Sequence, residues 1–267
     1  MTLDPALVDA LGAFAAHPRV LVATDFDGAL APLVLDPMDS RPVEGGMESL
    51  AALADLPGTT VALVSGRALG PLRQLSGAQD PLLLIGSHGA EDSRRPDGLA
   101  LSEEQRTLLT QLEDALRAVV EQHPGARIED KPAGRVLHTR GLPPEVSGAA
   151  LAAATAVGER HTSLVVTPGK EVVELAVAHV GKGVALVALA EELGVDAVLY
   201  AGDDVTDEHA FVALAQDTDL ARAERRLTIR VGDGESAAQH RVNDERALVR
   251  AFEVLLSARA GRSNDGG

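Results

Sequence analysis

Two carboxylates stand at the end of an apolar segment near the N-terminus. In the segment RVLVATDFDGALAPL, Asp25 and Asp27 flank Phe26 and directly precede Gly28. Two residues apart at the end of an extended segment, both side chains lean to the same side and can reach one bound group. Two like charges so close raise each other's pKa unless a cation lies among them. The spacing therefore indicates acid–base, nucleophilic or metal-binding chemistry.

Further polar side chains follow three other apolar segments. Because the carboxyl ends of parallel strands meet at one edge of a sheet, the residues directly after each strand are the candidates for a ligand site. These residues are Ser65, Gly66, Arg67, Ser87, His88, Gly89, Asp203, Asp204, Thr206 and Asp207. The sequence thus predicts that four strands deliver carboxylates, hydroxyl groups and an arginine to one edge.

A divalent metal ion would balance these carboxylates. The candidate ligands are carboxylate oxygens and the chain has no cysteine, and both observations favour Mg²⁺. The segment DFDGAL lacks the third acidic ligand and the glycine at the positions where a calcium-binding loop requires them. The absence of cysteine also excludes disulfides and thiolate nucleophiles, and it fits a reducing cytoplasm.

The charge balance and the hydropathy pattern argue against several kinds of partner. Lysine and arginine number 24 and aspartate and glutamate 40, which gives a formal net charge of −16. A surface of this sign repels phosphate backbones, so nucleic acid is not expected as a partner. No apolar run approaches the roughly 18 residues that span a bilayer, and the N-terminal segment lacks a signal-peptide pattern. We therefore expect a cytoplasmic protein with no membrane partner.

The order of apolar segments predicts an α/β fold. Short β-branched runs alternate with alanine-rich helical stretches, which is typical of parallel βαβ units with both sheet faces covered. The expected strands are 20–24, 60–65, 82–86, 197–202 and 227–232. They lie in both ends of the chain. We therefore predict a doubly wound parallel sheet built from residues 1–97 and 179–257.

The middle of the chain, residues 98–178, has a different pattern. Helical stretches at 102–122 and about 144–160 each precede two short strand-like segments, which are joined by the turns KPAG and TPGK. This αββαββ order predicts a half-buried antiparallel sheet inserted between the two parts of the parallel one. The tail, residues 258–267, is expected to be disordered.

Four motifs at these positions carry a resemblance to known proteins. DFDG, SGR, the lysine of GKG and GDDVTDE resemble the four signature motifs of haloacid dehalogenase-like (HAD-like) phosphatases. The length, the αββαββ insertion and the stretch GDDVTDEHAF resemble the trehalose-6-phosphate phosphatases in particular, over about residues 18–255. The resemblance implies a HAD-like, Rossmann-like core with an α/β cap that closes during the reaction.

The resemblance also implies roles for the strand-end residues. It makes Asp25 the nucleophile, which forms an aspartyl phosphate, and Asp27 the acid that protonates the leaving group and then activates water. Ser65 would bind phosphoryl oxygens, and Lys182 would neutralise negative charge. The implied Mg²⁺ ligands are Asp25, Asp27 through its carbonyl group, Asp203 and, as indirect or occasional ligands, Asp204 and Asp207.

A set of substrate-binding residues follows from the same resemblance. In the family, two pairs of residues bind the second glucose ring. One pair is an acidic residue two positions before a lysine, and the other is a lysine four positions before a glutamate. The segments EDK and GKEVVE match these pairs in kind and spacing. The expected substrate-binding residues are Gly66, Arg67, His88, Glu129, Lys131, His138, Arg140, Lys170 and Glu174. From the residues alone, those in the insertion are ordinary exposed polar positions, His88 is equally a turn histidine, and GDDVTDE is equally a helix N-terminus capped by Asp204 or Thr206.

The activity that the resemblance implies is hydrolysis of trehalose 6-phosphate to trehalose and phosphate, with a functional link to trehalose-6-phosphate synthase. A phosphatase acting on sucrose phosphate, mannosylglycerate phosphate or a hexose phosphate shares the core motifs, so only the cap discriminates. The alternative from another class is a non-catalytic sugar-phosphate sensor or a subunit of a synthase complex. Two positions depart from the family pattern: Ala29 stands where members often have Thr, and Ala-Val follows Leu175 in place of Arg-Pro.

Overall fold

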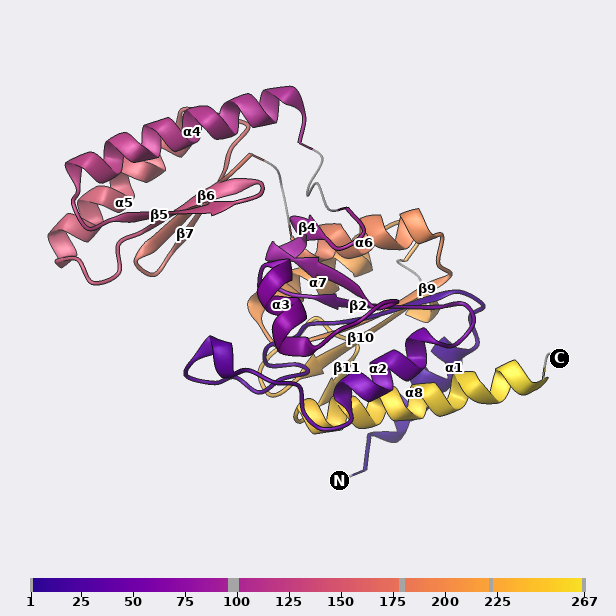
Figure 1. The fold of residues 1–267 in the computed structure, drawn as a ribbon. Coiled ribbons are helices and arrows are strands. Elements are labelled where there is room, and N and C mark those ends of the chain that lie inside the picture. The colour runs from indigo at the N-terminus through magenta and orange to yellow at the C-terminus, as the bar shows by residue number, and fades with distance from the viewer. Residues whose placement is uncertain (1, 96–100, 178–180, 221–222, 266–267) are drawn as a thin grey trace. The chain divides into compact units, whose positions relative to one another are not determined.

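The chain folds into two compact units in the computed structural model, which describes residues 2–95, 101–177, 181–220 and 223–265. One unit combines Met1–Pro96 with Gly181–Gly267, and the other is Asp97–Val180 (Figure 1). We refer to the first as the core unit and to the second as the cap unit. The predicted limits of the insertion, residues 98 and 178, differ from these limits by one and two residues, whereas the predicted end of the core, residue 257, lies ten residues before Gly267.

The core unit is built on a seven-stranded sheet in the order β11-β10-β9-β1-β2-β3-β4. Its strands are β1 (Val20–Thr24), β2 (Thr59–Val64), β3 (Leu83–Gly86), β4 (Glu91–Asp92), β9 (Ala197–Gly202), β10 (Arg226–Val231) and β11 (His240–Val242). Neighbouring strands are parallel except β3 and β4. Every residue of β1 is buried, because this strand is central in the sheet and covered on both faces. The predicted doubly wound parallel sheet is confirmed, and each expected strand agrees within one residue at either end.

Helices cover both faces of this sheet. Four of them pack on one face: α1 (Pro5–Ala15), α2 (Gly46–Ala54), α3 (Leu69–Ser76) and α8 (Glu245–Asp265). On the other face lie α6 (Lys182–Leu193) and α7 (Val205–Gln216). Alternate residues of β1 enter the two apolar clusters, Val22 the first and Leu21 the second, as the twofold period of a strand requires. No helix among the described residues is long and apolar enough to cross a bilayer.

The cap unit is a four-stranded antiparallel sheet with helices on one face. Its elements are α4 (Glu103–Gln122), β5 (Arg127–Lys131), β6 (Gly134–His138), α5 (Pro144–Glu159), β7 (Val165–Gly169) and β8 (Val172–Ala176), and the sheet order is β5-β6-β8-β7. The order agrees with the predicted αββαββ pattern. The second turn differs from the prediction: because Gly169 pairs with Val172, β7 continues through TPG and the chain reverses at Lys170 and Glu171.

The C-terminal helix corrects the prediction of a disordered tail from residue 258. Helix α8 continues to Asp265, and Arg259 is only 6% exposed. Its guanidinium group donates to Thr59 Oγ1 (2.8 Å) and to the carbonyl groups of His17 (3.0 Å) and Pro57 (3.2 Å), among others. These partners are distant in sequence, so the small and polar residues of SARAGRSNDGG did not indicate them. Residues 266 and 267 lie outside the described part of the chain.

We expect Arg259→Ala to lower the free energy of unfolding by about 2 to 4 kcal/mol, because it removes one charged donor from several backbone carbonyl groups at once. Thermal unfolding followed by circular dichroism should show a fall in Tm of roughly 5 to 10 °C. Arg246→Ala, at an exposed position of the same helix, is the control and should change the Tm little. An unchanged Tm for the Arg259 variant would contradict the assignment.

Candidate active site

The carboxyl ends of neighbouring strands bring the predicted chemical groups together. Because β1 lies between β2 and β9, the residues that follow these strands, Asp25, Ser65 and Asp203, share one edge of the sheet. They contribute to a pocket of about 460 Å³ in the core unit. Its lining residues are Asp25, Asp27, Leu33, Val34, Pro37, Ser65, Gly66, Arg67, His88, Lys182, Asp203 and Asp204. Of the site residues predicted in the core unit, Asp207 alone is outside this set.

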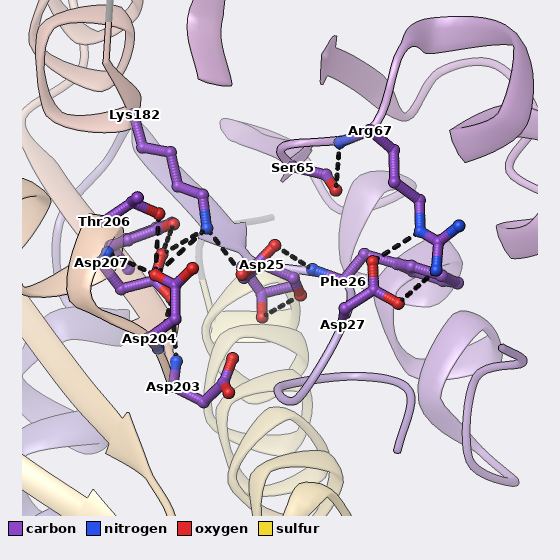
Figure 2. A network of polar contacts seen from close by, with 12 residues as sticks. Asp25, Phe26, Asp27, Ser65, Arg67, Lys182, Asp203, Asp204, Thr206 and Asp207 are labelled. Atoms are coloured by element: carbon purple, nitrogen blue, oxygen red, sulfur yellow. Dashed lines mark hydrogen bonds and ion pairs between the residues drawn. The ribbon is translucent and has the colours of Figure 1, made fainter. Parts of the chain in front are cut away.

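Asp25 is buried between two donors. The backbone N–H of Phe26 donates to its Oδ1 (2.6 Å), and Lys182 Nζ donates to its Oδ2 (2.6 Å), as Figure 2 shows. Burial raises the pKa of the Asp25 carboxyl well above its ordinary value, while the Lys182 ammonium opposes this shift. An ionised carboxylate at this position therefore depends on positive charge nearby.

Lys182 supplies part of that charge. It is the first residue of α6 and is 2% exposed. Its Nζ lies 2.6 Å from Asp25 Oδ2, 2.8 Å from Asp207 Oδ1 and 3.8 Å from Asp204 Oδ1. Burial disfavours the ammonium, but Asp25 and Asp207 outweigh it and raise the pKa of Lys182. The lysine therefore stays charged and joins the end of β1 to α7.

Asp207, in the first turn of α7, is fully buried and holds the acidic loop in place. Its Oδ1 accepts hydrogen bonds from Lys182 Nζ (2.8 Å) and the Tyr200 hydroxyl (2.5 Å). Its Oδ2 accepts from the backbone N–H groups of Asp203 (2.9 Å) and Asp204 (3.0 Å). Four donors occupy the four lone-pair positions of the carboxylate. This favours a supporting role for Asp207 over direct metal ligation.

The two interpretations of GDDVTDE are compatible. Asp204 is the N-cap of α7: its Oδ1 accepts from the backbone N–H of Asp207 (2.9 Å) and from Thr206 Oγ1 (2.7 Å) (Figure 2). The same loop presents Asp203 to the pocket. The segment is therefore a capped helix N-terminus and also one wall of the candidate site.

Asp203 has a partly buried carboxylate that is suited to bind a cation. Its Oδ1 is buried and has no hydrogen-bond partner among the described residues. Burial, with the charges of Asp207 and Asp204, raises the pKa of Asp203 to about 7. Gly28 explains how the carboxylate reaches this position: its φ is +77°, and a Cβ there would lie 2.0 Å from Asp203 Oδ2. The glycine of DFDG thus leaves room for a carboxylate from a different strand.

Asp27 is held by Arg67 rather than by the rest of the acidic cluster. Its two carboxylate oxygens accept from Arg67 Nε (2.5 Å) and Nη2 (2.7 Å), and Ser40 Oγ donates to it at 2.9 Å. The Arg67 guanidinium also lies 5.8 Å from the centre of the Phe26 ring (Figure 2). The arginine that was expected to contact substrate therefore contacts the predicted acid in this structure.

His88 lies at the pocket beside the SGR segment. Its backbone N–H donates to the Ser65 carbonyl (2.9 Å), and a Cβ on Gly66 would lie 2.6 Å from the imidazole ring. Ser87 and His88 both have left-handed backbones, with φ of 49° and 55°. Such conformations cost free energy and persist where neighbours hold them, as Glu91 does here by accepting from Ser87 Oγ (2.6 Å). The loop is therefore a turn, and its histidine lines the pocket.

Four of the six residues predicted to bind sugar in the cap unit lie on one face of its sheet. Ile128, Leu137 and Val173 pack under the helices, so the residues that alternate with them face the other way: Glu129, Lys131, His138 and Glu174. Lys131 Nζ lies 2.8 Å from Glu174 Oε2, and His138 Nε2 lies 2.7 Å from Glu129 Oε2. Arg140 follows β6 and Lys170 is in the turn before β8, both exposed.

Sequence reasoning missed some of the side chains that touch the site residues, and two of them bind the carboxylates of the acidic motifs. Ser40 donates to Asp27, and nothing in the sequence around Ser40 indicates this contact. Tyr200 donates to Asp207 from within β9. A signal for Tyr200 did exist, because it is the polar side chain in the otherwise apolar strand AVLYAG that leads into the acidic motif.

The doubly wound sheet, the inserted second sheet and the carboxylate pair after the central strand confirm the predicted HAD-like fold class. Within it, the chain belongs to the trehalose-phosphatase family, whose model matches residues 23–247. A trehalose-phosphate phosphatase of Mycolicibacterium paratuberculosis is 36% identical over 74% of this chain and 51% of that protein. A bifunctional trehalose-6-phosphate synthase/phosphatase of Thermoproteus tenax is 32% identical over 91% of this chain and 32% of that protein. The chain thus spans about half of the first relative's length and about a third of the second's.

Solved structures share the fold at lower sequence identity. The trehalose-6-phosphate phosphatase of Aspergillus fumigatus matches with a TM-score of 0.75 and 24% identity, over 96% of this chain and 98% of that one. The C-terminal domain of the trehalose synthase regulatory protein of Candida albicans matches with a TM-score of 0.65 and 16% identity, over 96% and 100%. At these identities the likeness shows the fold alone.

Proposed function

We propose that this chain is a Mg²⁺-dependent phosphoric monoester hydrolase that converts trehalose 6-phosphate to trehalose and phosphate. The observation that carries the proposal is the buried contact of Asp25 with Lys182, at 2.6 Å, beside an oxygen of Asp203 that has no hydrogen-bond partner within the described part of the chain. The substrate is supported by the family and by the names of the relatives. A functional link to trehalose-6-phosphate synthase is also proposed, since the Thermoproteus tenax relative is named for both activities.

In the proposed reaction, a carboxylate oxygen of Asp25 attacks phosphorus and forms an O–P bond while the bond to the sugar oxygen breaks. Asp27 gives a proton to that oxygen, which leaves as a sugar hydroxyl group. Asp27 then takes a proton from a water molecule, which attacks the phosphorus and releases phosphate and free Asp25. Lys182, in contact with Asp25, offsets negative charge in both steps, and Ser65 hydrogen-bonds the phosphoryl oxygens.

Arg67 affects how Asp27 performs these two tasks. Both Asp27 oxygens accept hydrogen bonds from the guanidinium group, which favours the carboxylate form over the acid. The carboxylate form suits the second step, in which Asp27 accepts a proton from water. For the first step, Asp27 has to carry a proton and face the sugar oxygen.

The residues present fit a magnesium ion. Oxygen atoms of Asp25, Asp203 and Asp207 lie within 4.8 Å of one another, and Asp203 Oδ1 lacks a partner among the described residues. We assign Asp25, Asp203 and the Asp27 carbonyl group as ligands. Asp204 is assigned as an indirect or occasional ligand, and Asp207 supports the loop without binding the metal. When bound, Mg²⁺ supplies positive charge to the phosphoryl oxygens.

Asp203→Asn should stabilise the metal-free protein and abolish its response to Mg²⁺. The raised pKa of Asp203, about 7, means that its stabilising contribution is present at low pH and lost as the pH rises through about 7. At pH 8 in EDTA, removing this charge should therefore raise the Tm by roughly 2 to 5 °C. Mg²⁺ should raise the Tm of the unmodified protein and not that of the variant. An equal Mg²⁺-induced rise in both would contradict the metal assignment.

The cap unit is proposed to select the substrate. The helix-free face of its sheet carries two carboxylates, a lysine and a histidine, which can exchange hydrogen bonds with the hydroxyl groups of a sugar. Arg140 and Lys170 are proposed as further sugar contacts, and Gly66, Arg67 and His88 as contacts from the core unit. Related phosphatases that act on other sugar phosphates would differ in these cap residues rather than in Asp25 or Lys182.

Glu174→Ala and Lys131→Ala should each reduce kcat/KM for trehalose 6-phosphate by roughly tenfold or more, because each leaves a polar partner unsatisfied. Activity on p-nitrophenyl phosphate, which has no second sugar, should change little. Glu145→Ala, at an exposed position of α5, is the matched control. Equal losses on both substrates would assign these residues to folding. Equal turnover of glucose 6-phosphate by the unmodified protein would favour a broad hexose phosphatase.

A non-catalytic sensor is the competing function, since the same fold occurs in a protein named as regulatory. A sensor requires no pairing of a nucleophile with a separate acid, whereas this chain keeps Asp25, Asp27, Lys182 and Asp203 together in one pocket. Release of phosphate from trehalose 6-phosphate in the presence of Mg²⁺ is the direct test. Binding without turnover at high protein concentration would favour the sensor.

A further inference from the structure

A tyrosine outside the pocket completes the buried network behind the site. Tyr200 is in β9, between Ala23 of β1 and Thr228 of β10, and it is fully buried. Its ring packs against Phe211 of α7, with centroids 5.8 Å apart, and its hydroxyl donates to Asp207 Oδ1 at 2.5 Å. It is the one tyrosine of the chain, which has no tryptophan.

The hydroxyl of Tyr200 shares its acceptor atom with Lys182. Asp207 Oδ1 accepts from Tyr200 at 2.5 Å and from Lys182 Nζ at 2.8 Å, while Lys182 Nζ also donates to Asp25 Oδ2 at 2.6 Å. The other oxygen of Asp207 is occupied by two backbone N–H groups. Any change in hydrogen bonding at Oδ1 therefore changes the bond from Tyr200 or the bond from Lys182.

The shared acceptor affects whether the Lys182 ammonium lies closer to Asp25 or to Asp207. With the tyrosine bond in place, Oδ1 is partly satisfied, and Lys182 can approach Asp25 closely. Without that bond, a buried lone pair of Asp207 would draw the ammonium toward itself, because an unsatisfied buried acceptor is costly. Burial raises the pKa of the Tyr200 phenol, with the Asp207 charge adding to the effect, so the hydroxyl stays protonated and remains a donor.

We propose that Tyr200 is a positioning residue that holds Lys182 against Asp25 by occupying the shared oxygen of Asp207. The proposal rests on the proposed function, because Lys182 matters through the phosphoryl transfer at Asp25. It assigns the hydroxyl a role beyond packing, which phenylalanine at this position could supply as well.

The first test compares Tyr200→Phe with Phe211→Leu, using p-nitrophenyl phosphate and saturating Mg²⁺. Tyr200→Phe keeps the ring and should lower kcat roughly tenfold with KM within about twofold, since small displacements of a charged group weaken transition-state stabilisation. Phe211→Leu disturbs the same apolar cluster and should lower the Tm with kcat within about twofold. An unchanged kcat in Tyr200→Phe, or an equal fall in both variants, would overturn the proposal.

A second test needs no substitution and no turnover. Tyrosine labelled with carbon-13 at Cζ gives one NMR signal, because the chain has one tyrosine. Adding Mg²⁺ with orthovanadate as a phosphoryl mimic should shift this signal, as Lys182 turns toward the anion and its bond to Asp207 weakens. If a rise in Tm shows that vanadate binds but the tyrosine signal does not shift, the proposed role of Tyr200 is overturned. Absence of both vanadate binding and turnover would instead overturn the proposed function, and the inference with it.

Discussion

Asp25→Asn is expected to abolish turnover, with kcat falling by at least about 10³-fold on any phosphate monoester. The amide keeps the shape of the carboxylate, and its oxygen can accept the bond from either Phe26 N–H or Lys182, but it cannot attack phosphorus. The fold should persist, because burial already makes the ionised form of Asp25 unfavourable. The measurements are phosphate release and thermal unfolding.

The matched control for this variant is Asp39→Asn. Asp39 is an exposed acidic residue in η1 (Pro37–Asp39), in the loop that follows β1, so it tests for a general effect of losing one negative charge near the site. It should retain nearly full activity. Substantial turnover by Asp25→Asn would remove the covalent mechanism, since the aspartyl phosphate could then not be an obligatory intermediate.

Lys182→Met is expected to have the second large effect, on both activity and stability. It removes the cation from the buried carboxylates of Asp25 and Asp207, at a cost of about 3 to 5 kcal/mol. It also removes the positive charge beside the reacting group, which should lower kcat by at least about 10³-fold. Phosphate release and thermal unfolding in EDTA are the two measurements.

The pH dependence of the Lys182→Met variant separates charge from packing. The Lys182 ammonium opposes the rise that burial causes in the pKa of Asp25, so its loss should move that pKa further upward. Protonation relieves the unpaired charge, and the gap in Tm between the variant and the unmodified protein should widen from pH 5.5 to pH 8. If the difference in Tm does not depend on pH, the loss of stability results from packing rather than from charge. Lys182→Met/Asp25→Asn should regain part of the stability and none of the activity.

Local pattern was sufficient to predict the sheet and the side chains at its edge. Apolar runs such as VLVAT are compatible with a strand covered on both faces, and the helical spacing between the runs implies parallel connections. Since parallel strands end at one edge, Asp25, Ser65 and Asp203 could be placed together without coordinates. The residues of the candidate site follow from that rule, whereas their roles came from the family resemblance.

Packing between segments that are distant in the sequence determined the hydrogen bonds and ion pairs that the sequence pattern did not predict. Arg67 is 40 residues from Asp27 and pairs with it because β1 and β2 are neighbours, and Lys182 reaches Asp207 across 25 residues. The tail was predicted to be disordered, but Arg259 meets carbonyl groups about 200 residues away. Hydrogen-bond partners of buried polar groups depend on which backbones pack together, and desolvation then makes those pairings obligatory. Composition and spacing do not reveal which backbones pack together or which polar groups lose their contact with water. These contacts are therefore seen only in the folded chain.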